Sequence, residues 1–301
     1  MNGFFNIWKP TGMSSAAVVA VMRRLTGEKR TGHAGTLDPE AAGVLPIMTG
    51  KATRLCDYLV DKEKEYEAVC AFGSSTDTQD ATGTALETGT DYPDLETVRE
   101  KAQELTGEIR QRPSMYSAIK VGGKPLYVRA RKGESIEVPE RTVTVYSIDV
   151  TGEEPDHGAA LRVRCGKGTY IRTLCDDLGK KCGCPAHMRS LLRTQSGVFT
   201  LETALSLDDA RELAAEGRLA ERMLPPDAGI RHLRRVDLPA RYAKPVAAGA
   251  KIPAEGIAED VPETENLRAY LEGEFWGIMR RDADLLVWKA LIAPERAPAR
   301  E

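Results

Sequence analysis

The sequence has few aromatic side chains (6%), and no stretch of it is apolar over the roughly 18 residues that a membrane-spanning helix needs. Its opening, from Met1 to Asn6, lacks a charged segment followed by an apolar one, so nothing indicates a secretory signal and we expect a cytoplasmic protein. With 42% hydrophobic and 29% charged residues, the composition is that of an ordinary globular protein. A length of 301 residues suggests about two domains.

Cysteines are too few for a disulfide framework. Six cysteines in 301 residues do not resemble the dense pattern of a small secreted domain. The one close pair is Cys182 and Cys184, and no second pair stands at a spacing that would complete four zinc ligands. We therefore expect reduced thiols and no metal site.

An excess of positive charge is also missing. The net charge is −3, whereas a protein that binds nucleic acid is usually basic. The charge is nevertheless segregated, because basic residues dominate segments 101–133 and 162–193 while acids gather at 77–100 and after residue 255. This pattern fits one face that meets RNA, and it fits solvated surface segments equally well.

The apolar periodicity predicts an α+β fold. Helices are expected after a cap at Ser14 or Ser15, after the cap Asp94, and near residues 171–178. Segment 31–50 contains four glycines and two prolines, so we predict a shaped loop there. Strands are expected at residues 3–7, 64–72, 143–150, 161–165, 267–271, 275–279 and 285–292.

Asp38 stands in the most informative segment, Gly32 to Pro39, where glycines and a proline surround it in a loop that is poor in charge. Pro39 disfavours helical backbone at Asp38, and the glycines permit close approach of a ligand. Residue chemistry alone leaves two interpretations open: Asp38 caps a following turn, or it is a catalytic carboxylate.

Segment 32–53 resembles the signature of the TruB family, the tRNA pseudouridine(55) synthases. Four further segments resemble that family in the same order, and together the similarity covers most of residues 3–200. They are KPTGMSS at 9–15, KEY at 64–66, PSMYSAIK at 113–120 and KGTYIR at 167–172.

This resemblance implies a pseudouridine-synthase-like catalytic domain over residues 1–235, with a mixed, largely antiparallel sheet and an RNA-clasping insertion at about 112–140. A small C-terminal β (PUA-like) domain over residues 236–301 would follow. The implied reaction converts uridine to pseudouridine at position 55 in the T loop of tRNA. It requires base flipping and an aspartate-dependent cleavage and re-formation of the glycosidic bond. Because this involves no oxidation, hydrolysis or group donor, we expect no cofactor.

The resemblance also implies roles for individual residues. Asp38 matches the catalytic carboxylate, and Arg172 matches an arginine that favours its ionised form. Tyr66 would stack on the target base and help to move the C5 proton. Tyr170 matches a wall of the base pocket, and Leu191 matches a leucine whose backbone contacts the flipped uracil.

Other matched positions concern the RNA. His33 would fill the space that the flipped nucleotide leaves. Where the family often has two arginines, this chain has Leu192-Arg193, which predicts one RNA-facing charge fewer. The side chains expected to contact RNA are Lys9, Lys120, Lys124, Arg129 and Arg131.

Two other functions stay open on the sequence alone. A non-catalytic RNA-binding or RNA-folding protein would use the basic segments without needing Asp38. A guide-dependent relative would act only inside a ribonucleoprotein. The excursion at residues 112–140 favours a stand-alone enzyme, a monomer that binds the tRNA T stem-loop without guide RNA or membrane, because such an enzyme must clasp RNA itself. Whether Asp38 attacks sugar or base, or abstracts a sugar proton, is not decided by the residues.

Overall fold

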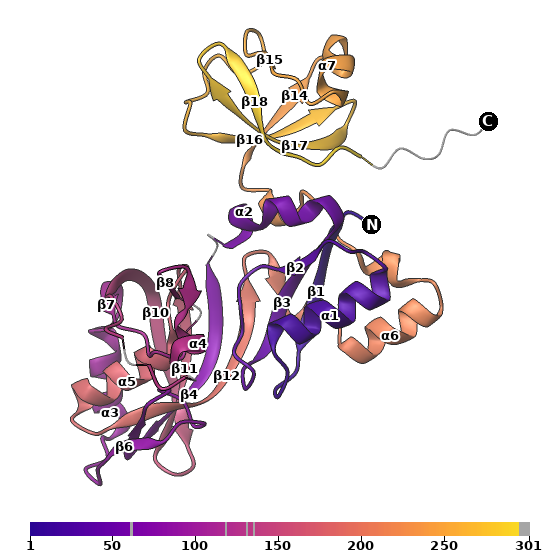
Figure 1. Ribbon diagram of the computed structural model, residues 1–301. Helices are drawn as coiled ribbons and strands as arrows, with labels where there is room; N and C mark the ends of the chain where they lie inside the picture. The colour runs from indigo at the N-terminus through magenta and orange to yellow at the C-terminus, as the bar shows by residue number, and fades with distance from the viewer. Residues whose placement is uncertain (61–62, 118, 131, 135, 295–301) are drawn as a thin grey trace.

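The computed structural model describes residues 1–60, 63–117, 119–130, 132–134 and 136–294 (Figure 1). Within them, nine strands form the main sheet in the order β1-β3-β12-β4-β11-β10-β7, with β2 on β3 and β13 on β12. Of these pairings only β3 with β12 is parallel, so the predicted α+β class with a mixed, largely antiparallel sheet is confirmed. The strands are β1 (Gly3–Lys9), β2 (Thr31–His33), β3 (Ala42–Thr49), β4 (Lys64–Phe72), β7 (Gly107–Gln111), β10 (Arg141–Glu154), β11 (Gly158–Cys165), β12 (Ala186–Ser196) and β13 (Phe199–Thr200).

Helices cover this sheet, and two of them begin at caps that the sequence predicted. The Ser14 side chain accepts a hydrogen bond from the backbone N–H of Ala17, and that of Asp94 accepts one from Thr97. None of the described helices is both long and apolar enough to cross a bilayer. The α-helices are α1 (Ser15–Thr26), α2 (Cys56–Val60), α3 (Leu95–Gln103), α4 (Leu126–Ala130), α5 (Ile171–Cys182), α6 (Leu207–Ala215) and α7 (Ala243–Ala247), and the longest 3-10 helix is η1 (Gly50–Leu55).

Two separate apolar clusters pack against different strands of the main sheet. Helices α3 and α5 pack against β4, β10 and β11. Helices α1 and α6 pack against β1 and β3 (Figure 1). The catalytic candidates lie between these two packed regions, where β4 and β12 meet β3.

The loop predicted for residues 31–50 is wrong, because β2 and β3 occupy much of it. Strand β3 is buried on both faces: Val44 and Met48 belong to one apolar cluster, and Leu45 and Ile47 to another. Such a strand shows a continuous apolar run instead of alternation, so the periodicity did not reveal it. Gly43 has φ +109°, and a Cβ there would lie 2.2 Å from a backbone oxygen of β12. This glycine therefore permits close strand packing rather than a loop.

Two smaller hairpins interrupt the main fold. Strands β5 (Ser74–Thr76) and β6 (Ala85–Thr88) pair with each other, as do β8 (Lys120–Val121) and β9 (Lys124–Pro125). The second hairpin confirms the extended excursion predicted within residues 112–140. The sequence did not predict the short helix α4, which follows it.

A second sheet has the order β14-β16-β17-β18-β15, with β14 parallel to β16. Its last three strands along the chain confirm the three predicted near the C-terminus. The domain boundary placed after residue 235 falls inside β14, so the second sheet begins before that boundary. The strands are β14 (Arg234–Leu238), β15 (Ile252–Pro253), β16 (Asn266–Leu271), β17 (Glu274–Asp282) and β18 (Leu285–Leu291).

The second sheet is joined to the main fold by a shared apolar cluster. Ile278 and Ile292 pack in the cluster that contains Leu55 of η1 and Leu59 of α2. The guanidinium of Arg54 also donates a hydrogen bond of 2.7 Å to the backbone oxygen of Leu291. The ribbon shows this sheet directly beside α2 (Figure 1).

We expect Ile278→Ala to weaken the packing between the second sheet and the main fold, and Met279→Ala to weaken the core of the second sheet alone. Both side chains are fully buried, but Ile278 faces the shared cluster whereas Met279 faces the core of the second sheet alone. Each truncation should lower the free energy of unfolding by about 2–4 kcal/mol, measured by chemical denaturation. Only Ile278→Ala should expose the connection near residues 225–233 to limited proteolysis under native conditions. Equal protease resistance of both variants would contradict the assignment.

Candidate active site

Asp38 lines a cavity of about 240 Å³ at the centre of the main fold. Five predicted residues meet there, namely Asp38, Tyr66, Tyr170, Arg172 and Leu191. They come from the loop between β2 and β3, from β4, from the start of α5 and from β12. Leu191 lies on the strand β12. Lys64 and Arg193 complete the charged lining.

Arg172 holds Asp38 in place. Its Nε lies 2.9 Å from Oδ2 of Asp38, and the Arg172 side chain is 6% exposed while that of Asp38 is 39% exposed. The other guanidinium nitrogens donate to the backbone oxygens of Thr78, at 2.9 Å, and Tyr116, at 3.1 Å. The arginine is therefore fixed from behind, and the carboxylate keeps an edge open to the cavity. A guanidinium beside a carboxylate in this geometry is what the resemblance implied.

Asp80 belongs to the same network, and the sequence did not reveal it. Its Oδ2 lies 3.6 Å from NH1 of Arg172. Its Oδ1 accepts hydrogen bonds from the hydroxyl of Thr78, at 2.8 Å, and from the backbone N–H of Thr82, at 3.0 Å. An aspartate between threonines indicates only a polar turn at the level of sequence. Its contact with Arg172 arises from tertiary packing.

Opposing effects act on the pKa of the Asp38 carboxyl. Burial raises its pKa above the usual value, and Arg172 opposes that rise. Asp80 raises the pKa further, whereas Lys9 lowers it. Arg172 thus favours the ionised form as predicted, but burial outweighs it. The carboxyl takes up a proton at higher pH than an exposed aspartate does.

The two tyrosines that line the cavity come from different elements. Tyr66 lies on β4 and is buried, between Glu65, which is half-buried, and Glu67, which is exposed. Tyr170 caps α5, and its backbone is clamped by Gln111, which donates to its oxygen at 3.1 Å and accepts from its N–H at 3.0 Å. Burial is the largest cause that raises the pKa of both phenols.

Lys9 is not an RNA-facing side chain, and that prediction is wrong. It is fully buried at the end of β1, where Nζ donates to the backbone oxygens of Pro10, at 2.8 Å, and Pro39, at 2.9 Å. Burial lowers its pKa to about 8, against the effects of Glu40 and Asp38. Lys9 therefore fastens the backbone immediately after Asp38.

Arg193 is buried as well, so it is not an RNA-facing charge. It is 1% exposed, and its guanidinium donates to backbone oxygens of Val44 and Gly35. His33 lies on β2, half-buried, and does not line the Asp38 cavity. Burial lowers the pKa of its imidazole.

Two further residues predicted to contact RNA, Lys124 and Arg129, lie in β9 and in α4, beside the hairpin of β8 and β9. Lys124 is exposed there. Arg129 donates to the backbone oxygen of Val121, at 3.2 Å, and pairs with Glu134, so it also stabilises the hairpin itself. The side chain of Lys120 and the whole of Arg131 lie outside the described residues.

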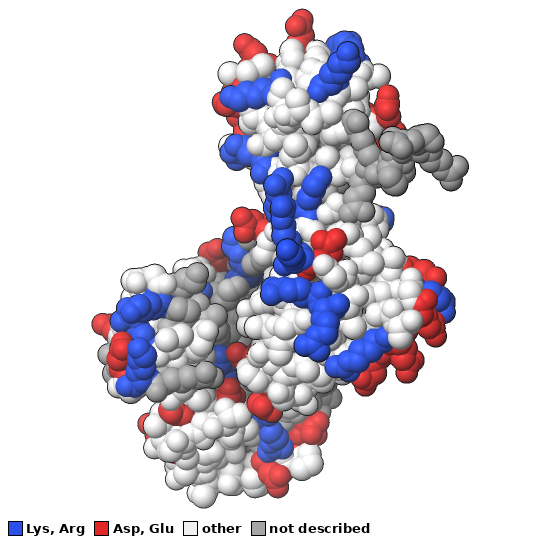
Figure 2. Space-filling view, turned by 45° about the vertical axis from the view of Figure 1, so that its right-hand side comes forward, with Lys and Arg blue, Asp and Glu red and all other residues white. Residues whose placement is uncertain are grey.

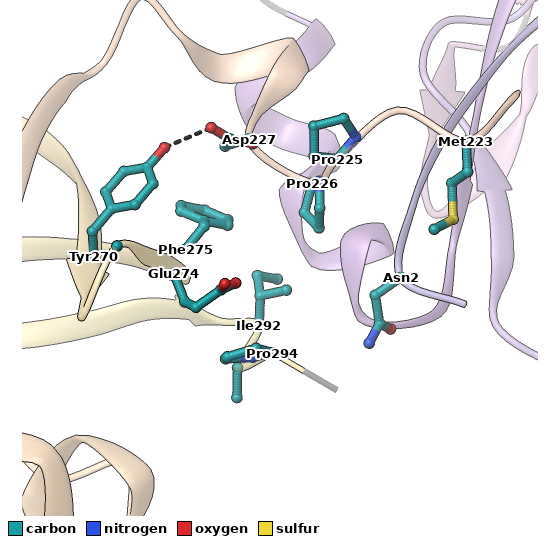
Figure 3. A pocket seen from close by; sticks show the side chains of 12 residues that line it. Asn2, Met223, Pro225, Pro226, Asp227, Tyr270, Glu274, Phe275, Ile292 and Pro294 are labelled. Atoms are coloured by element: carbon teal, nitrogen blue, oxygen red, sulfur yellow. Dashed lines mark hydrogen bonds between the residues drawn. The ribbon is translucent and has the colours of Figure 1, made fainter. Parts of the chain in front are cut away.

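A larger cavity of about 400 Å³ lies between the main fold and the second sheet (Figure 3). Its wall combines Pro225, Pro226 and Phe275 with two acids, Asp227 and Glu274. Asp227 already accepts a hydrogen bond from the hydroxyl of Tyr270. No lysine or arginine is among its described lining residues, so it does not suit a polyanion. The cavity at Asp38, which combines one carboxylate with three cations, is the candidate site.

Comparison with solved structures defines the class of protein. The chain is similar to a chain in a Cbf5-Nop10-Gar1 complex, with a TM-score of 0.72 and 28% identity, and the match covers 92% of this chain and 78% of that one. It shares the fold of a chain in an H/ACA RNP bound to a substrate RNA containing 2'-deoxyuridine, with a TM-score of 0.74 and 24% identity over 97% of this chain and 85% of that one. The fold is that of the pseudouridine synthases.

Sequence comparison gives the family. Residues 23–171 match the TruB family pseudouridylate synthase (N terminal domain), and residues 172–243 match the tRNA pseudouridylate synthase B C-terminal domain. The chain is 42% identical to tRNA pseudouridine synthase B of Bacillus licheniformis, over 90% of each protein. It is 41% identical to that of Alkaliphilus oremlandii, over 94% of each. The chain belongs to the TruB family, and its resemblance to that family is confirmed.

We expect Lys9→Met to act on the fold of the site and Lys124→Met to act on RNA binding. Without Lys9, two partly buried carbonyls lose their donor, so the free energy of unfolding should fall by about 1–3 kcal/mol and catalysis should fall with it. RNA affinity should stay near that of the wild type.

Lys124→Met is the matched control, because Lys124 is an exposed lysine. It should leave stability unchanged and weaken RNA binding, with a smaller salt dependence. Denaturation and filter binding at two salt concentrations measure both effects. Reduced RNA affinity in Lys9→Met at unchanged stability would restore the RNA-facing assignment.

Proposed function

We propose that this chain isomerises uridine to pseudouridine at position 55 in the T loop of tRNA, with Asp38 as the catalytic carboxylate. The observation that carries the proposal is the Asp38 carboxylate, held by Arg172 at 2.9 Å on the wall of a cavity that Tyr66 and Tyr170 also line. The names of the relatives, tRNA pseudouridine synthase B, support tRNA as the substrate. The enzyme acts in the cytoplasm, where tRNA is modified.

The reaction breaks the bond between N1 and the sugar, turns the base over and joins C5 to the same sugar carbon. A carboxylate supports this as a nucleophile or by taking a proton from the sugar. Oδ2 of Asp38 is engaged by Arg172, so we assign the reacting role to Oδ1. Arg172 orients the carboxylate and limits the rise of its pKa in a site that a bound base covers.

A uridine stacked in an RNA loop cannot reach an atom inside a cavity, so the nucleotide has to flip out of the stack. Tyr66 and Tyr170 offer aromatic faces against which the uracil stacks, and Leu191 closes the apolar side. His33, on the strand that leads into the Asp38 loop, fills the gap left in the RNA. One chain supplies all these residues, which supports action as a monomer.

The surface supports binding of a polyanion despite the net charge of −3. Lys and Arg side chains gather near the junction of the main fold and the second sheet (Figure 2). Arg23 and Arg24 end α1, and Lys51 and Arg54 lie on η1, which contacts both β2 and β18. Together with the hairpin at residues 120–125, this surface provides phosphate contacts without a guide RNA.

Asp38→Asn should abolish the reaction while leaving tRNA binding intact, because the amide keeps the shape of the side chain and loses its negative charge. The expected fall in rate is at least about 10³-fold. Tritium release from C5-labelled uridine in an unmodified tRNA transcript measures it.

A transcript with cytidine at position 55 is the substrate control and should release nothing above background. Release by Asp38→Asn at the wild-type rate would remove Asp38 from its role. Wild-type binding without any release would favour the non-catalytic RNA-binding function.

The pH dependence should respond to Arg172 and Asp80 with opposite signs. Since the ionised carboxylate is the active form, activity is present above the Asp38 pKa and lost as the pH falls through it. The raised pKa puts this acid limb above that of an ordinary aspartate. Arg172→Gln removes the main opposing charge and should move the limb to higher pH, whereas Asp80→Asn should move it to lower pH. Single-turnover rates across pH test this, and shifts of the same sign would refute it.

A further inference from the structure

Arg193 is the largest fully buried side chain in the described part of the chain. A guanidinium has five N–H donors and no acceptor, so its burial requires several acceptors around it. It lies on β12, where its backbone is the register partner of Tyr66 on β4 and of Gly43 on β3. The side chain therefore starts at the point where the three strands next to the cavity meet.

Arg193 connects three parts of the site. Nε donates to the backbone oxygen of Val44 on β3 at 2.8 Å. NH2 donates to the backbone oxygen of Gly35 at 3.0 Å, in the loop that carries Asp38. Tyr66, the register partner of Arg193, lines the same cavity, and the positive charge of Arg193 acts on the pKa of its phenol. The guanidinium thus joins the loop of Asp38 to the strand position opposite Tyr66.

Arg193 restricts how Tyr66 uses its hydroxyl. Because a guanidinium only donates, the Tyr66 oxygen can only accept from it, and the O–H of Tyr66 is left for another group. Tyr66 is buried and lines the Asp38 cavity, as Arg193 does. Burial raises the pKa of the phenol, whereas the positive charge of Arg193 lowers it.

We propose that Arg193 is a positioning residue for Tyr66, holding its oxygen so that the phenol can remove the C5 proton after the base has turned over. The inference rests on the proposed function, because only that reaction places a proton on C5 that has to leave.

The proton balance closes without a cofactor. Once C5 is bonded to the sugar, it still carries its hydrogen, and N1 and C6 share a double bond. The C5–H bond breaks, its electron pair forms the C5–C6 double bond, and the N1–C6 pair moves to N1. The O–H proton of Tyr66 moves to N1, and the oxygen, now a phenolate, takes the C5 proton, so Tyr66 ends as a phenol and N1 carries a hydrogen. Arg193 stabilises the negative charge that the oxygen carries between these two transfers.

Two variants, Arg193→Gln and Arg193→Lys, test the inference. The measurements distinguish slower C5 deprotonation from slower earlier steps of the reaction. With unmodified tRNA, Arg193→Gln should slow the single-turnover reaction by about 10²-fold. Its deuterium isotope effect with C5-deuterated uridine should be larger than that of the wild type. With 5-fluorouridine at the target position there is no C5 proton, so the loss of 5-fluorouridine in nuclease digests should keep nearly the wild-type rate. Arg193→Lys keeps the positive charge, so its single-turnover rate with unmodified tRNA should lie between those of the wild type and Arg193→Gln.

Two controls keep the result interpretable. Thr194→Val changes the neighbouring residue on β12, whose hydroxyl bonds to Glu65 instead, and should alter neither the rate nor the isotope effect. In a Tyr66→Phe background, Arg193→Gln should add no further loss, since its effect passes through the phenol.

Equal slowing of uridine and 5-fluorouridine, with an unchanged isotope effect, would overturn the inference and leave Arg193 a purely structural residue. If Arg193→Gln does not fold, Arg193→Lys carries the same comparison. A wild-type enzyme that forms no pseudouridine would instead refute the proposed function. If the wild type is active and Asp38→Asn is inactive, but Arg193→Gln does not slow C5 deprotonation specifically, this inference alone is refuted and the proposed function stands.

Discussion

The buried Arg172 guanidinium is the group on which the rest of the site depends. A charge with so little access to water is tolerated only when hydrogen bonds and opposite charges surround it. Arg172 meets this requirement with Asp38, Asp80 and the backbone oxygens of Thr78 and Tyr116. These partners come from the loop before β3, the turn after β5 and the root of the hairpin insertion. One side chain of α5 therefore fixes the Asp38 carboxylate and the base of the insertion at residues 112–140 together.

The site places three cations around a half-exposed carboxylate. Lys9 holds the backbone after Asp38, Arg172 holds the carboxylate itself, and Arg193 holds the backbone before it at Gly35. All three are buried and bonded to backbone oxygens, so their charges stay in place when the cavity fills. Fixed charges of this kind stabilise a developing charge without reorganisation during the reaction. The same burial raises the pKa of Asp38, so a larger fraction of the carboxyl is protonated at a given pH than for an exposed aspartate.

Local patterns in the sequence predicted the elements whose formation is itself local. The caps at Ser14 and Asp94 and the alternation along β4 depend on neighbours within a few residues. Strand β3 was missed because it is buried on both faces, which removes the alternation. Lys9 was misassigned since lysines are mostly exposed, and only tertiary packing encloses this one. Asp80 escaped notice for the same reason: its partner Arg172 is distant in sequence. The resemblance located Asp38 and Arg172, whereas the network behind them required the structure.

The second sheet bears on catalysis through packing. The apolar cluster that holds Ile278 and Ile292 also contains Ala34, four residues before Asp38, and Val44 and Met48 of β3. Well-packed cores transmit displacement because they contain few voids into which side chains can relax. The second sheet and the base of the Asp38 loop are therefore parts of one packed unit, and RNA that contacts both meets them at a fixed separation. A rigid separation favours an RNA whose folded shape already matches it, since neither partner then has to rearrange on binding.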